Sequence, residues 1–296
     1  MQEVSLGTRI STCLLWLAVS AAASATPVKI DPTPAALAHA MQGHRIVLLG
    51  EVHDNAAQHA LRAAALQRLL ATGVRPAIAF EQFDRERQGD IDRARRERPA
   101  DPDYLIAQAK GDPGWNWNFY RPYVALALEY DLPIVAANLS RDDAMKVAID
   151  GWRAVFDAAT IRQLGLDALP ADLRRKQEHA MAVGHCNLLP ADMLPPRANA
   201  QMARDIVMAQ SIRPYSDHGV VLLAGNGHVR RDIGVPVWLS AAMRASAISI
   251  GLLETNDDGS TPDSGADFDA YVVTGRAERA DPCEELAKRM HPGMGR

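Results

Sequence analysis

Residues 45–55 read Arg-Ile-Val-Leu-Leu-Gly-Glu-Val-His-Asp-Asn, an apolar run that ends in a glycine, acids and a histidine. The residues that follow, 55–71, are rich in Ala and Leu, with apolar side chains spaced three and four apart as on one face of a helix. Asn55 and Gln58 resemble a capping box at the start of this helix, and Gly73 is placed to end it. A buried strand followed directly by a helix is typical of an α/β protein with a parallel sheet.

The same kind of apolar run recurs along the chain, and helical patterns separate the runs. We therefore predict an α/β fold with a mostly parallel central sheet flanked by helices. Residues 140–217 carry no convincing strand pattern and are rich in helix formers interrupted by prolines, which predicts a largely helical insertion subdomain. Residues 26–296 are then expected to form a single α/β domain. The predicted strands cover residues 45–51, 77–82, 133–138, 219–225, 247–253 and 270–274.

The composition is that of an ordinary globular protein, with 48% hydrophobic and 23% charged residues. The formal net charge is -4, from 32 Lys and Arg against 36 Asp and Glu, so the overall charge gives no reason to expect nucleic acid as a partner. Cys13, Cys186 and Cys283 are too few for a disulfide framework and lack the paired spacing of a structural zinc site. The sequence leaves open whether Cys186 and Cys283 pair.

Residues 1–25 have the pattern of a cleavable signal peptide. Arg9 precedes a short apolar stretch, and the small residues 23–25, Ala-Ser-Ala, form a cleavage site of the A-x-A type. The stretch is too short to span a bilayer, although an uncleaved anchor helix, or a start codon assigned upstream of the true one, is the alternative. Cys13 is badly placed for a lipoprotein cleavage box, so a lipid anchor is not expected. We predict a periplasmic or secreted protein.

Polar residues end the predicted strands, at the edge where open parallel sheets bind ligands. Two Gly-x-x-His tetrads, residues 50–53 (Gly-Glu-Val-His) and 225–228 (Gly-Asn-Gly-His), close the first and the fourth strand. If these strands are neighbours, His53 and His228 lie on the same rim, and Glu81 joins them. Either histidine alone is more commonly a buried residue that hydrogen-bonds a carbonyl, but the coincidence of the two tetrads favours a site.

Imidazoles beside carboxylates form either a metal site or an acid/base set. For a divalent metal ion, the predicted ligands are His53, Glu81 and His228. For a hydrolase, the same three residues and Glu51 are the predicted catalytic set, with Glu51 or Glu81 as the general base. The glycine of each tetrad is expected to let the backbone turn tightly, so that the histidine faces the crevice.

An aromatic cluster lies at residues 114–123, Gly-Trp-Asn-Trp-Asn-Phe-Tyr-Arg-Pro-Tyr. This segment is either a packed loop that seats a helix over residues 124–130, or a wall for a flat apolar ligand with a tyrosine oxygen at its edge. In the insertion, His179, His185 and Cys186 precede a helical stretch, residues 201–208, in which Gln201 and Asp205 share one face. That region is either a surface face or a lid over the crevice.

These motifs, in this order, resemble the ChaN-like haem-binding uptake proteins, which share a superfamily with the Tiki metalloproteases and the erythromycin esterases. The resemblance extends over about residues 40–239. It rests on Leu-Leu-Gly-Glu-Val-His-Asp-Asn (48–55), Ala-Phe-Glu-Gln-Phe (79–83), Trp-Asn-Phe-Tyr-Arg-Pro (117–122), Ala-Ala-Asn-Leu (136–139), Gln-Met-Ala-Arg-Asp (201–205) and Leu-Ala-Gly-Asn-Gly-His-Val (223–229).

The resemblance implies an exported haem-binding protein of haem or iron uptake, with two haems stacked in a homodimer and outer-membrane haem uptake machinery as a possible partner. It also implies a tyrosine as the axial ligand. Tyr120 is our choice because it lies in the shared segment, and Tyr123 and His185 are the other predicted cofactor-binding residues. Tyr215 and Cys186 are further options, since haem iron accepts each of these side-chain types.

The same resemblance implies an alternative function. The Tiki and erythromycin esterase relatives suggest a metal-dependent or acid/base hydrolase that uses the two Gly-x-x-His motifs and the glutamates. The sequence motifs are compatible with both ligand carriage and catalysis, so whether the protein is an enzyme stays open.

Overall fold

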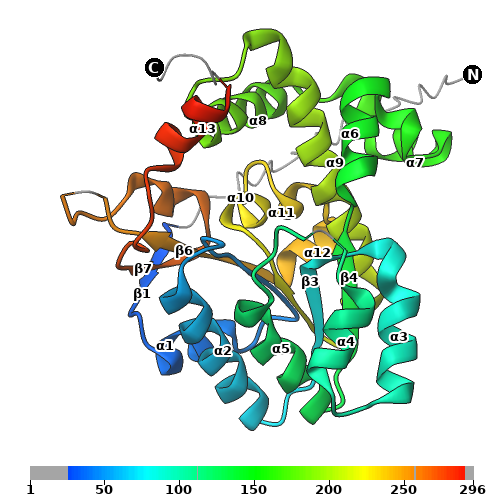
Figure 1. Ribbon diagram of the computed structural model, residues 1–296, viewed down its shortest axis with the longest axis vertical. Helices are drawn as coiled ribbons and strands as arrows, with labels where there is room; N and C mark the ends of the chain where they lie inside the picture. The colour runs from blue at the N-terminus through cyan, green and yellow to red at the C-terminus, as the bar shows by residue number, and fades with distance from the viewer. Residues whose placement is uncertain (1–25, 112, 257, 291–296) are drawn as a thin grey trace, which may run out of the picture.

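The computed structural model of the chain describes residues 26–111, 113–256 and 258–290 (Figure 1); the predicted signal peptide, residues 1–25, lies outside them. A seven-stranded sheet has the order β1-β7-β6-β2-β5-β3-β4, and every pair of neighbours is parallel. The predicted α/β fold with a parallel sheet is confirmed. The strands are β1 (Val28–Ile30), β2 (Ile46–Leu49), β3 (Ala77–Asp84), β4 (Ile134–Asn138), β5 (Val220–Leu223), β6 (Ala247–Glu254) and β7 (Ala270–Thr274).

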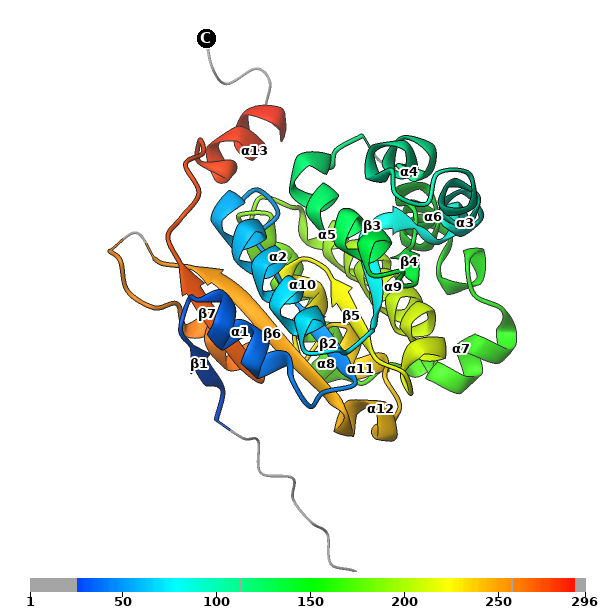
Figure 2. The same cartoon turned by 90° about the horizontal axis from the view of Figure 1, so that it is seen from below.

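Helices cover both faces of the sheet (Figure 2), because the central strands bury side chains on both sides. Val47 and Leu49 face the layer of α1 to α5, whereas Ile46 and Leu48 face α6, α7, α9, α11 and α12. The helices are α1 (Pro34–Met41), α2 (Ala56–Ala71), α3 (Gln88–Glu97), α4 (Pro102–Ala109), α5 (Trp117–Glu129), α6 (Arg141–Asp150), α7 (Ala158–Leu164), α8 (Ala171–Gly184), α9 (Leu194–Ile212), α10 (Asn226–Val229), α11 (Val235–Trp238), α12 (Ala241–Ala245) and α13 (Pro282–Met290).

Strand register brings the two tetrads together. β2 and β5 are neighbours, with Leu49 opposite Leu223, and β3 flanks β5 on its other side, with Phe80 opposite Leu223. These three strands therefore reach the carboxyl edge of the sheet at the same level. The residues that follow, including Glu51 and Glu81, lie on one rim.

Side-chain caps start helices close to this rim. The Asn55 side chain accepts a hydrogen bond from the Gln58 backbone N–H (3.1 Å) at the start of α2. Ser140 caps α6 in the same way. The aromatic segment differs from expectation, because Asn116 caps α5 and the helix begins at Trp117 rather than at residue 124.

Between β4 and β5 the described chain forms helices and turns but no strand, which agrees with the predicted helical insertion. α8 packs on α9 and lies beyond the edge of the sheet from which α10 starts (Figure 1). A disulfide between Cys186 and Cys283, with a Cα–Cα distance of 5.6 Å, joins the end of α8 to α13. Among the described helices, none has the length and apolar character needed to cross a membrane.

Candidate functional site

Glu51 is the centre of one half of the rim. It directly follows the Gly50 that ends the first apolar run, and only 2% of its surface is exposed. Its carboxylate forms an ion pair with the fully buried guanidinium of Arg62, from α2. Oε1 also accepts a hydrogen bond from the Tyr120 hydroxyl (2.5 Å) and lies 2.9 Å from Nδ1 of His53. One carboxylate thus connects the end of β2 with α2 and α5.

Further hydrogen bonds fix the groups around this ion pair. Arg62 donates from Nη2 to the Leu49 carbonyl (2.8 Å). His59 Nε2 lies 3.0 Å from the His53 carbonyl oxygen, and the Tyr123 hydroxyl donates to the His59 carbonyl (2.8 Å). Burial lowers the pKa of His59 to about 4, so this imidazole is neutral at neutral pH.

His228 is the centre of the other half. It is buried between two carboxylates, with Nδ1 2.6 Å from Asp205 Oδ1 and Nε2 3.3 Å from Glu81 Oε1. Burial by itself would lower the pKa of His228, but the two carboxylates outweigh it and raise that pKa to about 10. His228 is therefore an imidazolium at neutral pH. Burial raises the pKa of Asp205 to about 6.

Glu81 links the two halves. Its Oε2 accepts a hydrogen bond from the Gly225 N–H (2.7 Å). Burial would raise the pKa of Glu81, but His228, His53 and this N–H lower it well below its usual range. A Cβ atom on Gly225 would lie 2.7 Å from the His53 ring, so the missing side chain lets that ring approach Glu81.

The role predicted for the two tetrad glycines requires correction. Neither Gly50 nor Gly225 has a positive φ, so neither is needed for a tight left-handed turn. Each is needed for space instead: a Cβ on Gly50 would lie 2.9 Å from Val229 and against Asn226.

The structure brings Glu51, His53, Glu81 and His228 to one rim, but not as a set of metal ligands. Among the described residues, no group of three or more His, Cys, Asp or Glu side chains is arranged to hold a metal ion. The two nitrogens of His228 instead face the carboxylates of Asp205 and Glu81, at 2.6 Å and 3.3 Å. This geometry does not support a divalent ion on His53, Glu81 and His228.

The predicted cofactor-binding residues lie in two different environments. Tyr120 and Tyr123 are buried, at 1% and 0% exposure, and burial raises the pKa of both phenols. The aromatic segment packs inward, since Phe119 stacks on His59 with ring centroids 4.6 Å apart. This favours the packing role of the segment over a ligand wall. His185, by contrast, lines an open cleft.

The cleft has a volume of about 710 Å³ and lies between the rim and α8. His53 and Gly227 line it from the rim, and seven residues line it from the insertion: Gln177, His179, Ala180, Met181, Val183, Gly184 and His185. The volume lies in the range of small-molecule and cofactor sites. The end of α8 and His185 therefore form one wall of the cleft, and the alternative of a lid stays a prediction.

Two histidines in this cleft share one arrangement. His53 directs Nδ1 at Glu51 Oε1, and His185 directs Nδ1 at the Met181 carbonyl oxygen (2.9 Å). Both acceptors require a proton on Nδ1, which leaves Nε2 of each neutral ring with its lone pair. No described residue hydrogen-bonds either Nε2 atom, and the His53 side chain is 47% exposed. Both Nε2 atoms are thus available to a ligand.

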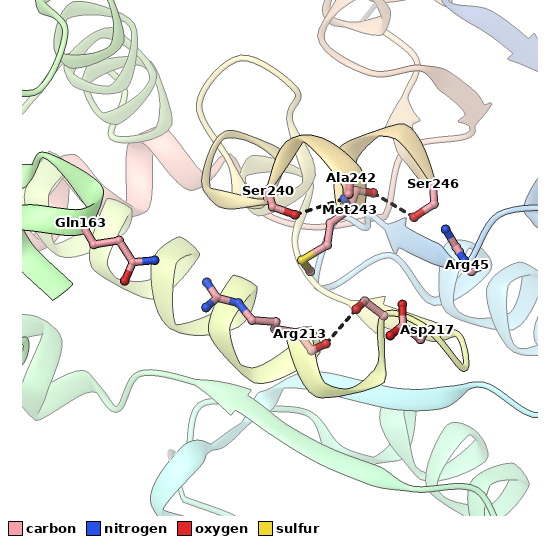
Figure 3. A pocket seen from close by; sticks show the side chains of 9 residues that line it. Arg45, Gln163, Arg213, Asp217, Ser240, Ala242, Met243 and Ser246 are labelled. Carbon is pink, nitrogen blue, oxygen red and sulfur yellow. Dashed lines mark hydrogen bonds between the residues drawn. The ribbon is translucent and has the colours of Figure 1, made fainter. Parts of the chain in front are cut away.

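Another hollow, of about 390 Å³, lies at the opposite edge of the sheet (Figure 3). Arg45 and Ser246, which directly precede β2 and β6, line it. Ligands of parallel α/β sheets bind at the carboxyl edge, where the predicted residues lie. The cleft under α8 is therefore the candidate site.

Residues 37–239, more than half of the chain, match the family described as "Haem-binding uptake, Tiki superfamily, ChaN". The chain belongs to the ChaN family. The similar solved structures include one described as cofacial haem binding to ChaN of Campylobacter jejuni, with 20% identity, 79% of this chain and 88% of that chain covered, and a TM-score of 0.61. At this identity the likeness shows the fold alone.

More distant structures include an erythromycin esterase, EreC, in its open conformation, with 18% identity, 86% of this chain and 81% of that chain covered, and a TM-score of 0.41. A Bacillus cereus protein has 13% identity, with 87% of this chain and 78% of that chain covered, and a TM-score of 0.41. No curated protein sequence matches the chain.

Sequence reasoning gave no site role to Arg62, His59 or Asp205. A signal for Arg62 existed, because a glutamate buried at a strand end needs a cation, and Arg62 lies in the apolar helix that follows. The signal for Asp205 was its spacing of four residues from Gln201, whose Nε2 lies 3.2 Å from His228 Nε2.

The ion pair at the rim makes a prediction about stability. Arg62→Met leaves the Glu51 carboxylate buried without its cation, and we expect it to lower the free energy of unfolding by about 3–5 kcal/mol. Adding Glu51→Gln to this variant removes the uncompensated charge and should restore part of the loss. Urea unfolding of the two variants measures both effects. Equal stability of Arg62→Met and the wild type would contradict the assigned role.

Proposed function

We propose that this protein binds haem in the cleft between the rim and α8, and that it does so in haem or iron uptake. One observation carries the proposal: His53 and His185 line the same cleft from two elements, each with Nδ1 held by an acceptor and Nε2 free. Imidazole is a common axial ligand of haem iron, and a ligating histidine usually donates its other N–H to a carbonyl or carboxylate. Membership in the ChaN family supports the same ligand.

The lining of the cleft also suits a porphyrin. Ile233, Leu253 and Phe268 give it an apolar wall, whereas the imidazoles lie on the rim and on α8. Haem is the cargo of the proposed function; the apolar side chains exclude water from it, and one of the two imidazoles holds its iron on one face of the porphyrin. Two chains facing one another across bound haems, as cofacial binding suggests, and delivery through outer-membrane machinery belong to the same proposal.

The tyrosine ligand that the resemblance implies stays a prediction. To reach an iron in the cleft, the Tyr120 hydroxyl would have to leave the core and its hydrogen bond to Glu51. The imidazoles of His53 and His185 reach the cleft without any rearrangement, so the geometry favours them.

Haem titration of the purified protein tests the ligand. We expect His185→Ala or His53→Ala to weaken haem binding roughly tenfold or more, because the iron loses an axial nitrogen. Tyr120→Phe should bind haem like the wild type, as should the control His218→Ala, which removes an exposed histidine outside the cleft. Soret absorbance reports affinity, and size exclusion with and without haem reports pairing. Loss of binding in Tyr120→Phe alone would restore the tyrosine assignment.

We also propose that the protein is exported. The Cys186–Cys283 disulfide supports this, because disulfides persist in oxidising compartments such as the periplasm. Cell fractionation followed by mass spectrometry is expected to find the protein in the periplasmic fraction, with its amino terminus at Thr26 and the two cysteines cross-linked. An intact residue 1 together with two free thiols would contradict export.

A second candidate function is acid/base hydrolysis, which the charge arrangement favours. His228 is held as a cation between Glu81 and Asp205, whereas His53 lines the cleft and its Nε2, which lies beside Gly225, accepts no hydrogen bond from a described residue. Paired groups with such different environments are typical of an acid and a base. Glu51 and Glu81 are each occupied by buried partners, so His53 suits the role of general base better than either glutamate.

Hydrolysis of p-nitrophenyl acetate by the haem-free protein tests this candidate. We expect His53→Ala to abolish the enzyme-dependent rate. The wild-type rate should fall as the pH rises through about 10, because His228 then loses its proton. His228→Gln should remove this alkaline limb of the profile, and His218→Ala should leave it unchanged. A wild-type rate equal to the buffer rate at every pH would refute hydrolysis of this ester class.

A further inference from the structure

A smaller hollow, of about 300 Å³, adjoins the cleft. The two share Met181, His185 and Gln201 in their linings. The smaller hollow is bounded by α6, α8 and α9, and none of the residues that line it is acidic. Three arginines line it: Arg141 from the start of α6, and Arg197 and Arg204 from α9.

These arginines lack the carboxylate partners that arginines have elsewhere in the chain. Arg204 donates from Nη1 to the Asn138 side-chain oxygen (3.0 Å), which holds its guanidinium in place. Arg141 and Arg197 make no hydrogen bond or ion pair with any described residue. By comparison, Arg121 binds Asp103 through two hydrogen bonds of 2.7 Å. None of the three guanidiniums therefore forms an ion pair with a described residue, although Arg141 also borders a neighbouring hollow lined by Asp142 and Asp143, and Arg204 acts on the pKa of Asp205 from nearby.

We propose that this hollow is an anion-binding subsite that receives the carboxylates of the ligand held in the adjoining cleft. The inference rests on the proposed haem function and deepens it. Haem joins an apolar macrocycle to two propionate carboxylates, and the cleft and the hollow offer an apolar wall beside a group of arginines. Arginine suits this role because its planar guanidinium can bind a carboxylate through two parallel hydrogen bonds.

The position of His185 supports a single ligand that spans both spaces. Its ring lines the cleft and the hollow alike, and its Nδ1–H is fixed to the Met181 carbonyl. An iron bound to Nε2 of His185 would hold the macrocycle next to the arginines. The subsite thus adds orientation, since carboxylates at one edge select one way for the porphyrin to enter.

The test compares iron protoporphyrin with its dimethyl ester, which lacks the two negative charges. We expect the wild type to bind the free acid roughly tenfold or more tightly than the diester. The double variant Arg141→Gln/Arg197→Gln should lose this preference by binding the acid more weakly, with the diester unaffected. These two arginines are suitable because neither has a described partner that the change would orphan. Arg174→Gln, an exposed arginine of α8 outside both hollows, is the matched control.

Titration with inorganic phosphate separates failure of the subsite from failure of haem binding. Suppose that neither porphyrin binds, but that the wild type binds phosphate and the double variant does not. This result supports the anion subsite and contradicts haem binding. If the porphyrins bind but the double variant keeps the wild-type preference for the acid, the subsite is overturned. The subsite is also overturned if no porphyrin binds and phosphate does not bind either. The same holds if no porphyrin binds and phosphate binds equally to the wild type and the double variant.

Discussion

The buried ion pair between Glu51 and Arg62 is the constraint on which the rim depends. A carboxylate at the end of a central strand is removed from water, and it is tolerated there because a buried guanidinium and two further donors surround it. Because Arg62 of α2 and Tyr120 of α5 both contact this carboxylate, the two helices pack at the end of β2. The same carboxylate fixes the position of His53. The polar rim is thus held by the same contacts that pack the helices against the sheet.

The rim has a buried half and an open half, which differ in charge. In the buried half, Glu81 and Asp205 hold His228 as a cation whose two nitrogens are both occupied. In the open half, the half-exposed His53 side chain lines the cleft, with one nitrogen directed at Glu51 and the other beside Gly225 without a described hydrogen-bond partner. This division makes His228 a fixed charge and His53 the group that can meet a ligand.

The insertion adds a second wall to the rim and so forms the open cleft. α9 supplies Asp205 and Gln201 to His228, and α8 brings His185 over the cleft. The disulfide from Cys186 to Cys283 connects the end of α8, one residue after His185, to the helix at the end of the chain. The wall of the cleft is therefore cross-linked next to a proposed ligand. The arginine-lined hollow lies on the other side of the same histidine.

By itself, the sequence determined the parallel α/β fold, the strands from β2 to β7, the caps at Asn55 and Ser140, and the gathering of Glu51, His53, Glu81 and His228 on one edge. These features follow from local periodicity and from the rule that parallel strands end on the same side. β1 was not predicted, because three residues are too few to show the alternation of apolar and polar side chains that marks a strand.

Only the tertiary structure decided what each side chain can do. Contacts between segments far apart in the chain decide four features of the site. They bury Tyr120, occupy the nitrogens of His228, pair Cys186 with Cys283, and place three arginines around one hollow. No local pattern encodes such contacts, because each depends on how neighbouring elements pack. Sequence therefore located the polar edge of the sheet, whereas packing decided which nitrogens and guanidiniums there lack a partner among the described residues.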